Sequence, residues 1–297
     1  MRRIGTLGRV PVAVVTGGNQ GLGLALVRLL CRRLGADGLV YLGARDPQRG
    51  AAAVDMLRDD GLTPRLHVVD VRDTSAVQAF AAALRDEHGG VDIVLSNAAA
   101  RRTPDRPESQ QIRTFVNTNN LGTRRMIDAF APILNDGSRF IVVASAFGSQ
   151  HFLPQPMHQR FDTTTMTLDD VDTVMNEFAS LVEAGAHEEA GWPADVNVVS
   201  KIGQVASMRV MARDLQSEAR RRGILVNAAC PGMVDTEASR PWFSSAALAA
   251  AKSPDDAAID VGWLATLPAG TTEPYGELVQ YRDVLPWDTA EWGRKFG

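Results

Sequence analysis

The chain has 297 residues, of which 45% are hydrophobic and 22% charged, and its formal net charge is −4. A slightly acidic globular composition without a run of lysines or arginines argues against a nucleic-acid partner. No apolar stretch approaches the ~18 residues that a membrane span needs, and no signal peptide follows Arg2 and Arg3. Cys31 and Cys230 are expected to be buried free thiols, which favours a cytoplasmic protein.

A glycine-rich turn stands near the start of the chain, in residues 12–30. An apolar run ends at Thr16, the turn contains Gly17, Gly21 and Gly23, and an amphipathic helical pattern follows at once. Glycines let the backbone approach phosphates closely, and a helix N-terminus offers unpaired N–H groups at the positive end of its dipole. The segment therefore predicts a nucleotide pyrophosphate site, although its spacing differs from the usual G-x-G-x-x-G fingerprint.

Short apolar runs of strand length alternate with helical patterns along the rest of the chain. Near-continuous apolar strands suit a parallel sheet that is covered on both faces. Ser253 and Pro254, followed by two acids, form a strong helix start. We predict a Rossmann-type doubly wound parallel sheet, built as a single domain over residues 1–297, with ligands at the carboxyl ends of its strands. The expected strands are 39–42, 66–71, 91–95, 140–144, 224–229 and 278–281.

One long segment, residues 147–192, interrupts this alternation. It contains irregular polar runs and a helical pattern near residues 168–182. A connection of this length is usually a functional lid or binding loop, and the alternative is that it covers an edge of the protein. No pair of its histidines has metal-ligand spacing on a helix, so no metal site is predicted.

Arg45 follows the second predicted strand. An acid at this strand tip binds the ribose 2′-hydroxyl of NAD, whereas an arginine accommodates the 2′-phosphate of NADP. Arg45 therefore favours NADP(H), and the alternative is that Asp46 pairs with Arg45 at the surface.

Several motifs resemble those of the short-chain dehydrogenases/reductases. Residues 16–23 resemble the family's T-G-x-x-x-G-x-G loop, residues 96–99 its N-N-A-G segment, and residues 231–236 its P-G-x-V-x-T segment, which contacts the nicotinamide. Asn119 matches the asparagine that ties the family's proton relay to a helix, and Ser145 matches the catalytic serine. The resemblance covers nearly the whole chain.

The resemblance implies a set of site residues. The catalytic set is Ser145, Lys201, Asn119 and Asn197. The cofactor-binding set is Gly17, Asn19, Gln20, Gly21, Leu22, Gly23, Arg45, Asp70, Val71, Asn97, Ala98, Lys201, Pro231, Gly232, Val234 and Thr236.

Within this family the chain is most similar to the monomeric carbonyl reductases. The likeness is carried by residues 61–67, by Gly191-Trp192-Pro193 and by the long 147–192 insertion. In those enzymes the insertion covers the helical surface that relatives use to form tetramers, so a monomer is expected. They reduce ketones, aldehydes and quinones with NADPH, which implies a small-molecule carbonyl or quinone substrate here.

Asn197 departs from the family pattern. The family carries Y-x-x-x-K at this helix, whereas this chain has Asn197-Val198-Val199-Ser200-Lys201. The tyrosine is the family's general acid, the lysine lowers its pKa and binds the nicotinamide ribose, and the serine polarises the carbonyl oxygen. An asparagine amide donates a hydrogen bond but does not give up a proton at ordinary pH, and general acid catalysis contributes about 10² to 10⁴ in rate.

Three interpretations of Asn197 follow. The chain is a reductase in which Ser145, Lys201 or a water passes the proton, or whose substrate needs little acid catalysis. Alternatively, the fold guides a cyclisation, dehydration or isomerisation, or it binds the cofactor without being an enzyme. An active site altered by design is also compatible with one sequence.

Other conspicuous side chains have simpler interpretations. Trp192, Phe152, Trp242 and Phe243 form either an aromatic wall for a ring-shaped substrate or anchors for their loops. The arginines at positions 101, 102 and 106 are expected to form a solvated surface cluster.

Overall fold

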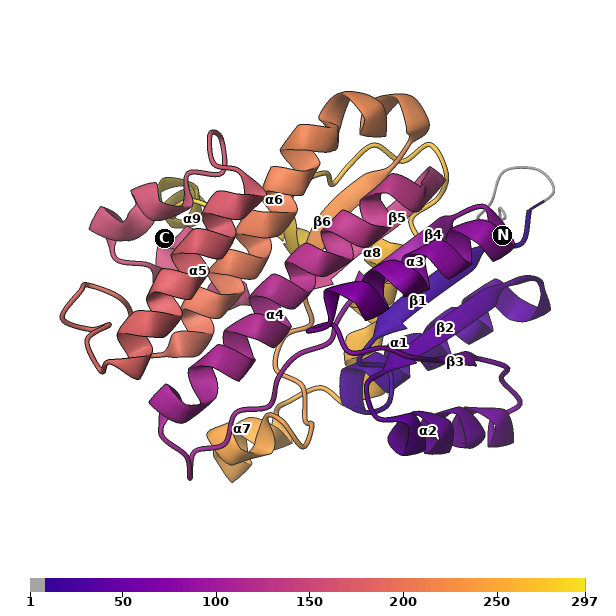
Figure 1. The fold of residues 1–297 in the computed structure, drawn as a ribbon, viewed down its shortest axis with the longest axis horizontal. Coiled ribbons are helices and arrows are strands. Elements are labelled where there is room, and N and C mark those ends of the chain that lie inside the picture. Colours follow the sequence, from indigo (N-terminus) through magenta and orange to yellow (C-terminus); the bar gives the residue numbers. More distant parts are fainter. Residues whose placement is uncertain (1–8, 297) are drawn as a thin grey trace.

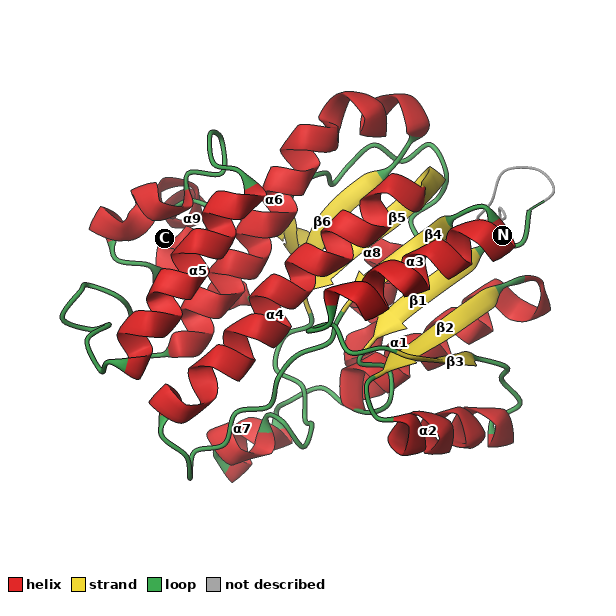
Figure 2. Cartoon of the chain, in the orientation of Figure 1, coloured by secondary structure: helices red, strands yellow, loops and turns green. Residues whose placement is uncertain are grey.

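The computed structural model of the protein describes residues 9–296, which fold around one eight-stranded sheet (Figures 1 and 2). The strand order is β3-β2-β1-β4-β5-β6-β7-β8; β1 to β7 run parallel, and β8 pairs antiparallel with β7. This is the doubly wound order, so the predicted fold class is confirmed. The strands are β1 (Val12–Thr16), β2 (Leu39–Ala44), β3 (Arg65–Val68), β4 (Val91–Ser96), β5 (Leu134–Val143), β6 (Leu225–Cys230), β7 (Leu278–Gln280) and β8 (Asp283–Leu285).

Two layers of helices cover the sheet. Every residue of β1 and β4 is buried between these layers, which explains why their sequences are almost continuously apolar. One face carries α1 (Gly21–Leu34), α2 (Pro47–Asp59) and α8 (Pro254–Ala265). The other face carries α3 (Thr74–His88), α4 (Glu108–Phe130) and α6 (Val196–Arg222), which lie in front of the sheet in Figure 1.

The short helices α7 (Ser245–Ala249) and α9 (Thr289–Phe296) follow the sixth strand and end the chain. Ser253 accepts a hydrogen bond from the Asp256 N–H and begins α8, as its sequence predicts. Both cysteines are free thiols, Cys230 buried and Cys31 partly buried. Within the described residues, no helix is long and apolar enough to span a membrane.

Two strands differ from their predicted bounds by more than two residues. β3 ends at Val68 instead of residue 71, because the Asp70 carboxylate accepts the Arg72 N–H and forms a turn that stops the strand. β5 begins at Leu134, well before residue 140, because Leu134 pairs with Val91 ahead of a register shift in the ladder. The first part of β5 was not predicted because its residues are mostly polar and do not continue the apolar pattern.

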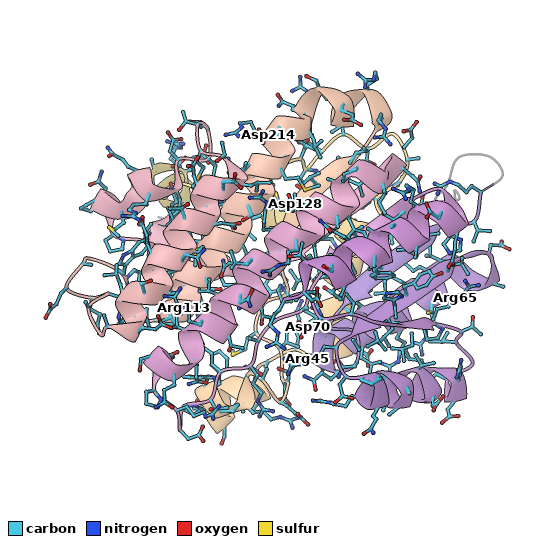
Figure 3. The ribbon with its side chains drawn as sticks, in the orientation of Figure 1. Arg45, Arg65, Asp70, Arg113, Asp128 and Asp214 are labelled. Carbon is cyan, nitrogen blue, oxygen red and sulfur yellow. The ribbon has the colours of Figure 1, made fainter. Side chains whose placement is uncertain are left out.

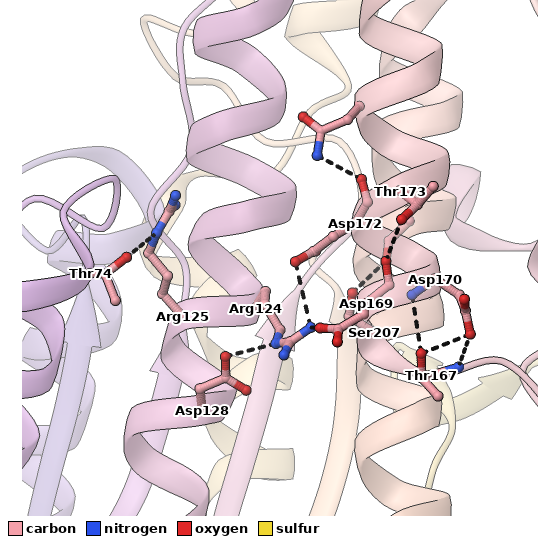
Figure 4. Close-up of polar contacts among 12 residues, drawn as sticks. Thr74, Arg124, Arg125, Asp128, Thr167, Asp169, Asp170, Asp172, Thr173 and Ser207 are labelled. Atoms are coloured by element: carbon pink, nitrogen blue, oxygen red, sulfur yellow. Dashed lines mark hydrogen bonds and ion pairs between the residues drawn. The ribbon is translucent and has the colours of Figure 1, made fainter.

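The insertion forms a third helical layer against the α4/α6 face. Its helix α5 (Leu168–Glu183) packs on both α4 and α6 around a separate apolar core that contains Phe161, Met175 and Phe178. At its start Thr167 and Asp170 form a reciprocal capping box (Figure 4). The insertion therefore covers an apolar face of α4 and α6.

Charged residues also join the insertion to α4. Arg124 donates to Asp128 at 2.7 Å and to Asp169 of α5 at 2.7 Å, and it lies 3.5 Å from Asp172 (Figure 4). Burial raises the pKa of Asp172 to about 6. The contact between α4 and α5 thus combines an apolar core with one arginine shared among three acids.

For Trp192 the structure favours the second of the two interpretations, an anchor for its loop over an aromatic wall. Its ring is 4% exposed and packs against Phe161 and Phe178 in the core of the insertion. Its apolar surface is used to join two segments of the insertion, so it has no free face for a ligand.

Candidate active site

The glycine-rich turn forms a cradle between β1 and α1. Gly17 has φ of +66°, and a Cβ there would stand 2.9 Å from Ala98 Cα. A Cβ on Gly23 would stand 2.1 Å from the Gly17 carbonyl oxygen, so the helix can approach the turn only without a side chain. Gln20, the N-cap of α1, makes no side-chain capping bond, and the first turn contains no acid. Its N–H groups therefore remain available for an anion.

Thr16 and Asn97 fix the two strand ends that form this crevice. The Thr16 hydroxyl accepts the N–H groups of Asn97 and Ala98 at 3.0 and 3.1 Å. Asn97 Nδ2 donates to the Thr16 carbonyl at 2.9 Å. These bonds join β1 to β4 at the point where the direction of the strand order changes, which is where doubly wound sheets bind ligands.

A cavity of about 300 Å³ opens from this cradle. Of the residues predicted to bind the cofactor, those that line it are Gly17, Asn19, Gln20, Gly21, Leu22, Gly23, Arg45, Asp70, Val71, Asn97, Ala98 and Thr236. Pro231, Gly232, Val234 and Lys201 lie outside this lining, on the segment after β6 and on α6.

Two arginines, Arg45 and Arg49, line the cavity beside β2 and α2, together with Asp46 and Asp70. Arg45 stands at the end of the second strand beside Asp70 (Figure 3). The guanidinium of Arg72 holds the pKa of Asp70 below its ordinary value. Asp46 caps α2 by accepting the N–H groups of Gln48 and Arg49, so its carboxylate has a role that does not involve Arg45.

Arg49 also lines the cavity, and the sequence reasoning missed it. Its guanidinium donates to the side chain of Gln20, which joins α2 to the glycine-rich turn. Its position four residues after Arg45, in the first turn of the predicted helix after the second strand, was the available signal.

The predicted catalytic residues lie on three elements at one end of the sheet. Ser145 follows β5 and accepts the Phe147 N–H at 3.3 Å, at the start of a short 3₁₀ turn, Ala146–Gly148. Helix α6, which carries Asn197 and Lys201, packs on this turn. Asp195 caps α6 by accepting the Asn197 N–H at 2.9 Å, so the asparagine occupies the first turn of the helix and is partly buried.

Lys201 lies against the end of β6. Burial lowers the pKa of Lys201 to about 8, and the nearby Cys230 acts in the opposite direction. A lysine with a pKa in this range exists as both ammonium and amine near neutral pH, which suits proton transfer.

Asn119 is a buried residue of α4 and holds two elements together. Its Oδ1 accepts the Ala100 N–H at 2.9 Å, and its Nδ2 contacts the Ser200 hydroxyl of α6 at 3.4 Å. The next residue, Asn120, exchanges two hydrogen bonds with Ser200. This amide pair sets the position of α6 on α4, beside Lys201.

The expected solvated arginine cluster is wrong for Arg102. Its side chain is only 10% exposed, and it pairs with Glu108 and, at 3.3 Å, with Asp195. Its guanidinium also lies 5.0 Å from the Phe115 ring centroid. The side chain is buried because it meets both acids and aromatic faces there, and a sequence window does not show that arrangement.

The site fits a dinucleotide. The glycine cradle and the uncapped helix start can hold a pyrophosphate, and the two arginines of the cavity can hold a further phosphate. The fold and this crevice together define a nucleotide-binding α/β protein with a serine after β5 and a lysine on α6.

The chain belongs to the short-chain dehydrogenase family, whose sequence model ("short chain dehydrogenase") matches residues 11–157. It is 36% identical to "Carbonyl reductase [NADPH] 1" of Mus musculus over 281 residues, which is 93% of this chain and 98% of that protein. It is also 36% identical to the Homo sapiens protein of the same name, over 94% of this chain and 99% of that protein.

Solved structures agree with the fold. Salutaridine reductase from Papaver somniferum superposes with a TM-score of 0.78 at 22% identity, covering 90% of this chain and 99% of that chain. The predicted family resemblance is therefore confirmed by relatives that span almost the whole sequence.

Proposed function

We propose that this chain is an NADPH-dependent reductase of a bulky carbonyl or quinone substrate that uses an atypical proton donor. The family and its carbonyl reductase relatives support the class of an NADP-dependent oxidoreductase. The observation that carries the proposal is the glycine-cradled cavity, which Arg45 and Arg49 help to line. These two side chains offer positive charge to a 2′-phosphate, as NADP requires.

The residues that would hold the cofactor are the glycine turn, Asn97, Asp70 and the two arginines of the cavity. When bound, NADPH supplies the hydride that a carbonyl carbon accepts. Five further residues would complete the cofactor site on the side of the proposed catalytic residues: Lys201, Pro231, Gly232, Val234 and Thr236. Their role in cofactor binding is part of the proposal.

The protein's own residues would handle the carbonyl oxygen. We infer that the Ser145 hydroxyl donates a hydrogen bond to this oxygen, and that the Lys201 ammonium supplies the proton, directly or through a water. The Asn197 amide donates a hydrogen bond but keeps its protons. Lys201 fits the role of donor because burial brings its pKa to about 8. Asn119 supports the arrangement by fixing α4 against α6.

Phe147 supports a bulky substrate. It follows Ser145 by two residues, is 37% exposed, and makes an edge contact with Phe152 at 5.3 Å. An exposed aromatic ring beside the serine offers a stacking surface to a quinone or an aromatic ketone.

Replacement of Asn197 tests the proposal. NADPH oxidation is measured against a panel of quinones and aromatic ketones for the parent, for Asn197→Tyr and for Asn197→Phe. The phenylalanine variant is the matched control, because it adds the ring without the acidic hydroxyl. We expect the parent to turn over at least one substrate, with a rate within about tenfold of Asn197→Tyr.

The contrary result is a parent that is nearly silent while Asn197→Tyr gains about 10² or more, the range that one general acid contributes. That result would assign the parent's own chemistry to the second candidate, a non-redox reaction such as cyclisation, dehydration or isomerisation. Asn197 is the observation that favours this candidate. Absence of turnover in all three proteins, with NADPH still bound, would support a binding protein.

We also propose that the protein is a monomer. Helix α5 and its apolar core cover α4 and α6, the helices that relatives of this family use for tetramers. Light scattering on the purified protein should give the mass of one 32.0 kDa chain, and a dimer or tetramer mass would contradict this.

A further inference from the structure

A chain of buried hydrogen bonds connects Lys201 to the backbone of α4. Lys201 Nζ donates to Gln204 Oε1 at 2.8 Å, and Gln204 Nε2 lies 3.2 Å from Thr123 Oγ1. Thr123 Oγ1 in turn donates to the carbonyl oxygen of Asn119 at 2.6 Å. Gln204 and Thr123 are 1% and 2% exposed, and neither was selected by motif or resemblance.

The chain of bonds has only one consistent direction. A threonine hydroxyl has one hydrogen, and Thr123 gives it to the Asn119 carbonyl, so the hydroxyl can only accept from Gln204. The NH₂ group of Gln204 must therefore face Thr123, and its oxygen must face Lys201. An ammonium donates a stronger, charge-assisted hydrogen bond to this oxygen than a neutral amine does. The oxygen therefore stabilises the charged form of Lys201.

We propose that Gln204, held in one orientation by Thr123, is a positioning residue that keeps the Lys201 ammonium in place and protonated. Gln204 acts through Lys201 and is not itself a catalytic residue. Its hydrogen bond offsets part of the desolvation penalty that burial imposes on the ammonium. This matters because Asn197 stands where the family has its acidic tyrosine. The consequence for catalysis rests on the proposed function, whereas the effect on Lys201 itself does not.

Among the residues that the structure describes, the other neighbours of Lys201 do not provide a charged partner for its ammonium. Gly148, in the turn after Ser145, packs against the Lys201 carbonyl and carries no charge. Cys230, at the end of β6, is the titratable group that acts on Lys201. Burial raises the pKa of the Cys230 thiol, which favours its neutral form. Helix α4 reaches Lys201 only indirectly: the neutral Thr123 of α4 bonds to the neutral Gln204 of α6, which bonds to Lys201.

The composition permits a direct test, because the sequence contains three lysines, Lys201, Lys252 and Lys295. The protein without cofactor is labelled with ¹³Cε-lysine, and each signal is followed by NMR as a function of pH. Lys201→Arg assigns the signal. We expect Gln204→Met, which keeps the volume and removes the acceptor, to lower the Lys201 midpoint by about one pH unit. We expect Gln204→Glu to raise it by at least as much.

The matched control is Gln216→Leu, at an exposed position of the same helix. It should leave the Lys201 midpoint unchanged. The proposal is overturned if both Gln204 variants titrate like the parent, and the glutamate variant keeps the test decisive should the methionine variant fold poorly.

A pH profile of NADPH oxidation separates this proposal from the proposed function. If the NMR midpoint moves and the pH profile moves with it, the role of Gln204 and the role of Lys201 as proton donor are both supported. If the midpoint moves and the profile does not, Gln204 still positions Lys201, but Lys201 is not the proton source.

Discussion

The guanidinium carbon of Arg102 lies 4.7 Å from the ring centroid of Trp242. Trp242 ends a 3₁₀ turn, Arg240–Trp242, in the segment after β6, whereas Arg102 follows β4 and also contacts the Asp195 cap of α6. One side chain thus holds together three segments that border the predicted catalytic residues.

We expect Arg102→Leu to lower the free energy of unfolding by about 1–3 kcal/mol, because it leaves Glu108 and Asp195 without their shared cation and removes a contact with an aromatic face. Urea denaturation measures the change. Arg101→Leu is the control, since Arg101 is exposed and meets Glu237 only at 3.5 Å. Equal stability of the Arg102 and Arg101 variants would show that the buried arginine is not needed.

Arg45→Ala should weaken NADPH binding by about 10- to 100-fold, because a charge-assisted hydrogen bond contributes about 1.5–3 kcal/mol. NADH binding should change little, since NADH lacks the 2′-phosphate. Fluorescence titration with both cofactors measures the ratio, and Arg49→Ala should change it in the same direction. Arg113→Ala is the control, because Arg113 lies on α4 (Figure 3) and pairs with Glu183 of the insertion. A parent protein that binds both cofactors equally would contradict the role of Arg45.

Reductase activity should fall as the pH rises above about 8. The pKa of Lys201 is about 8, so the proton-donating ammonium is lost by tenfold per pH unit above that value. Lys201→Arg should leave only a residual rate without this decline, because a guanidinium stays charged but does not give up its proton. Lys252→Arg, whose lysine pairs with Asp260 at 3.0 Å, should keep the parent profile. A profile that is flat to pH 9.5 in the parent would remove Lys201 as the donor.

Asp172→Asn should stabilise the protein at pH 8 by about 1–3 kcal/mol. The pKa of Asp172 is raised from 3.8 to about 6, so the folded state binds this proton more tightly than the unfolded chain. The parent therefore gains stability from this group as the pH falls from about 7 to 4, and the advantage of the variant should disappear over the same window. Asp169→Asn removes an exposed carboxylate from the same Arg124 and should change stability by less than about 1 kcal/mol. A pH-independent difference for Asp172→Asn would contradict the raised pKa.

Local sequence patterns determined the order of strands and helices, the glycine turn and the presence of Arg45 at a strand end. The spacing of apolar residues and the freedom of glycine are properties of short segments, and a doubly wound sheet follows from their alternation. The position of Asn197 in the family's motif was also readable from the chain, because it depends only on residues 191–201. The exact ends of β3 and β5 were not, because a side-chain turn and a bulge set them.

Only the tertiary structure decided what surrounds these residues. In the sequence, Gln204 is one more polar residue of a long helix. Its orientation toward Lys201 depends on a hydrogen bond to Thr123, which lies 81 residues earlier in the chain. The sequence left Trp192 open between a substrate-facing ring and a loop anchor, and it predicted Arg102 at the surface. Packing gives Trp192 an apolar core, and it gives Arg102 two acids and two aromatic rings. The reason is that desolvation and charge pairing depend on distances between elements, and these distances exist only once the sheet and its helices have assembled.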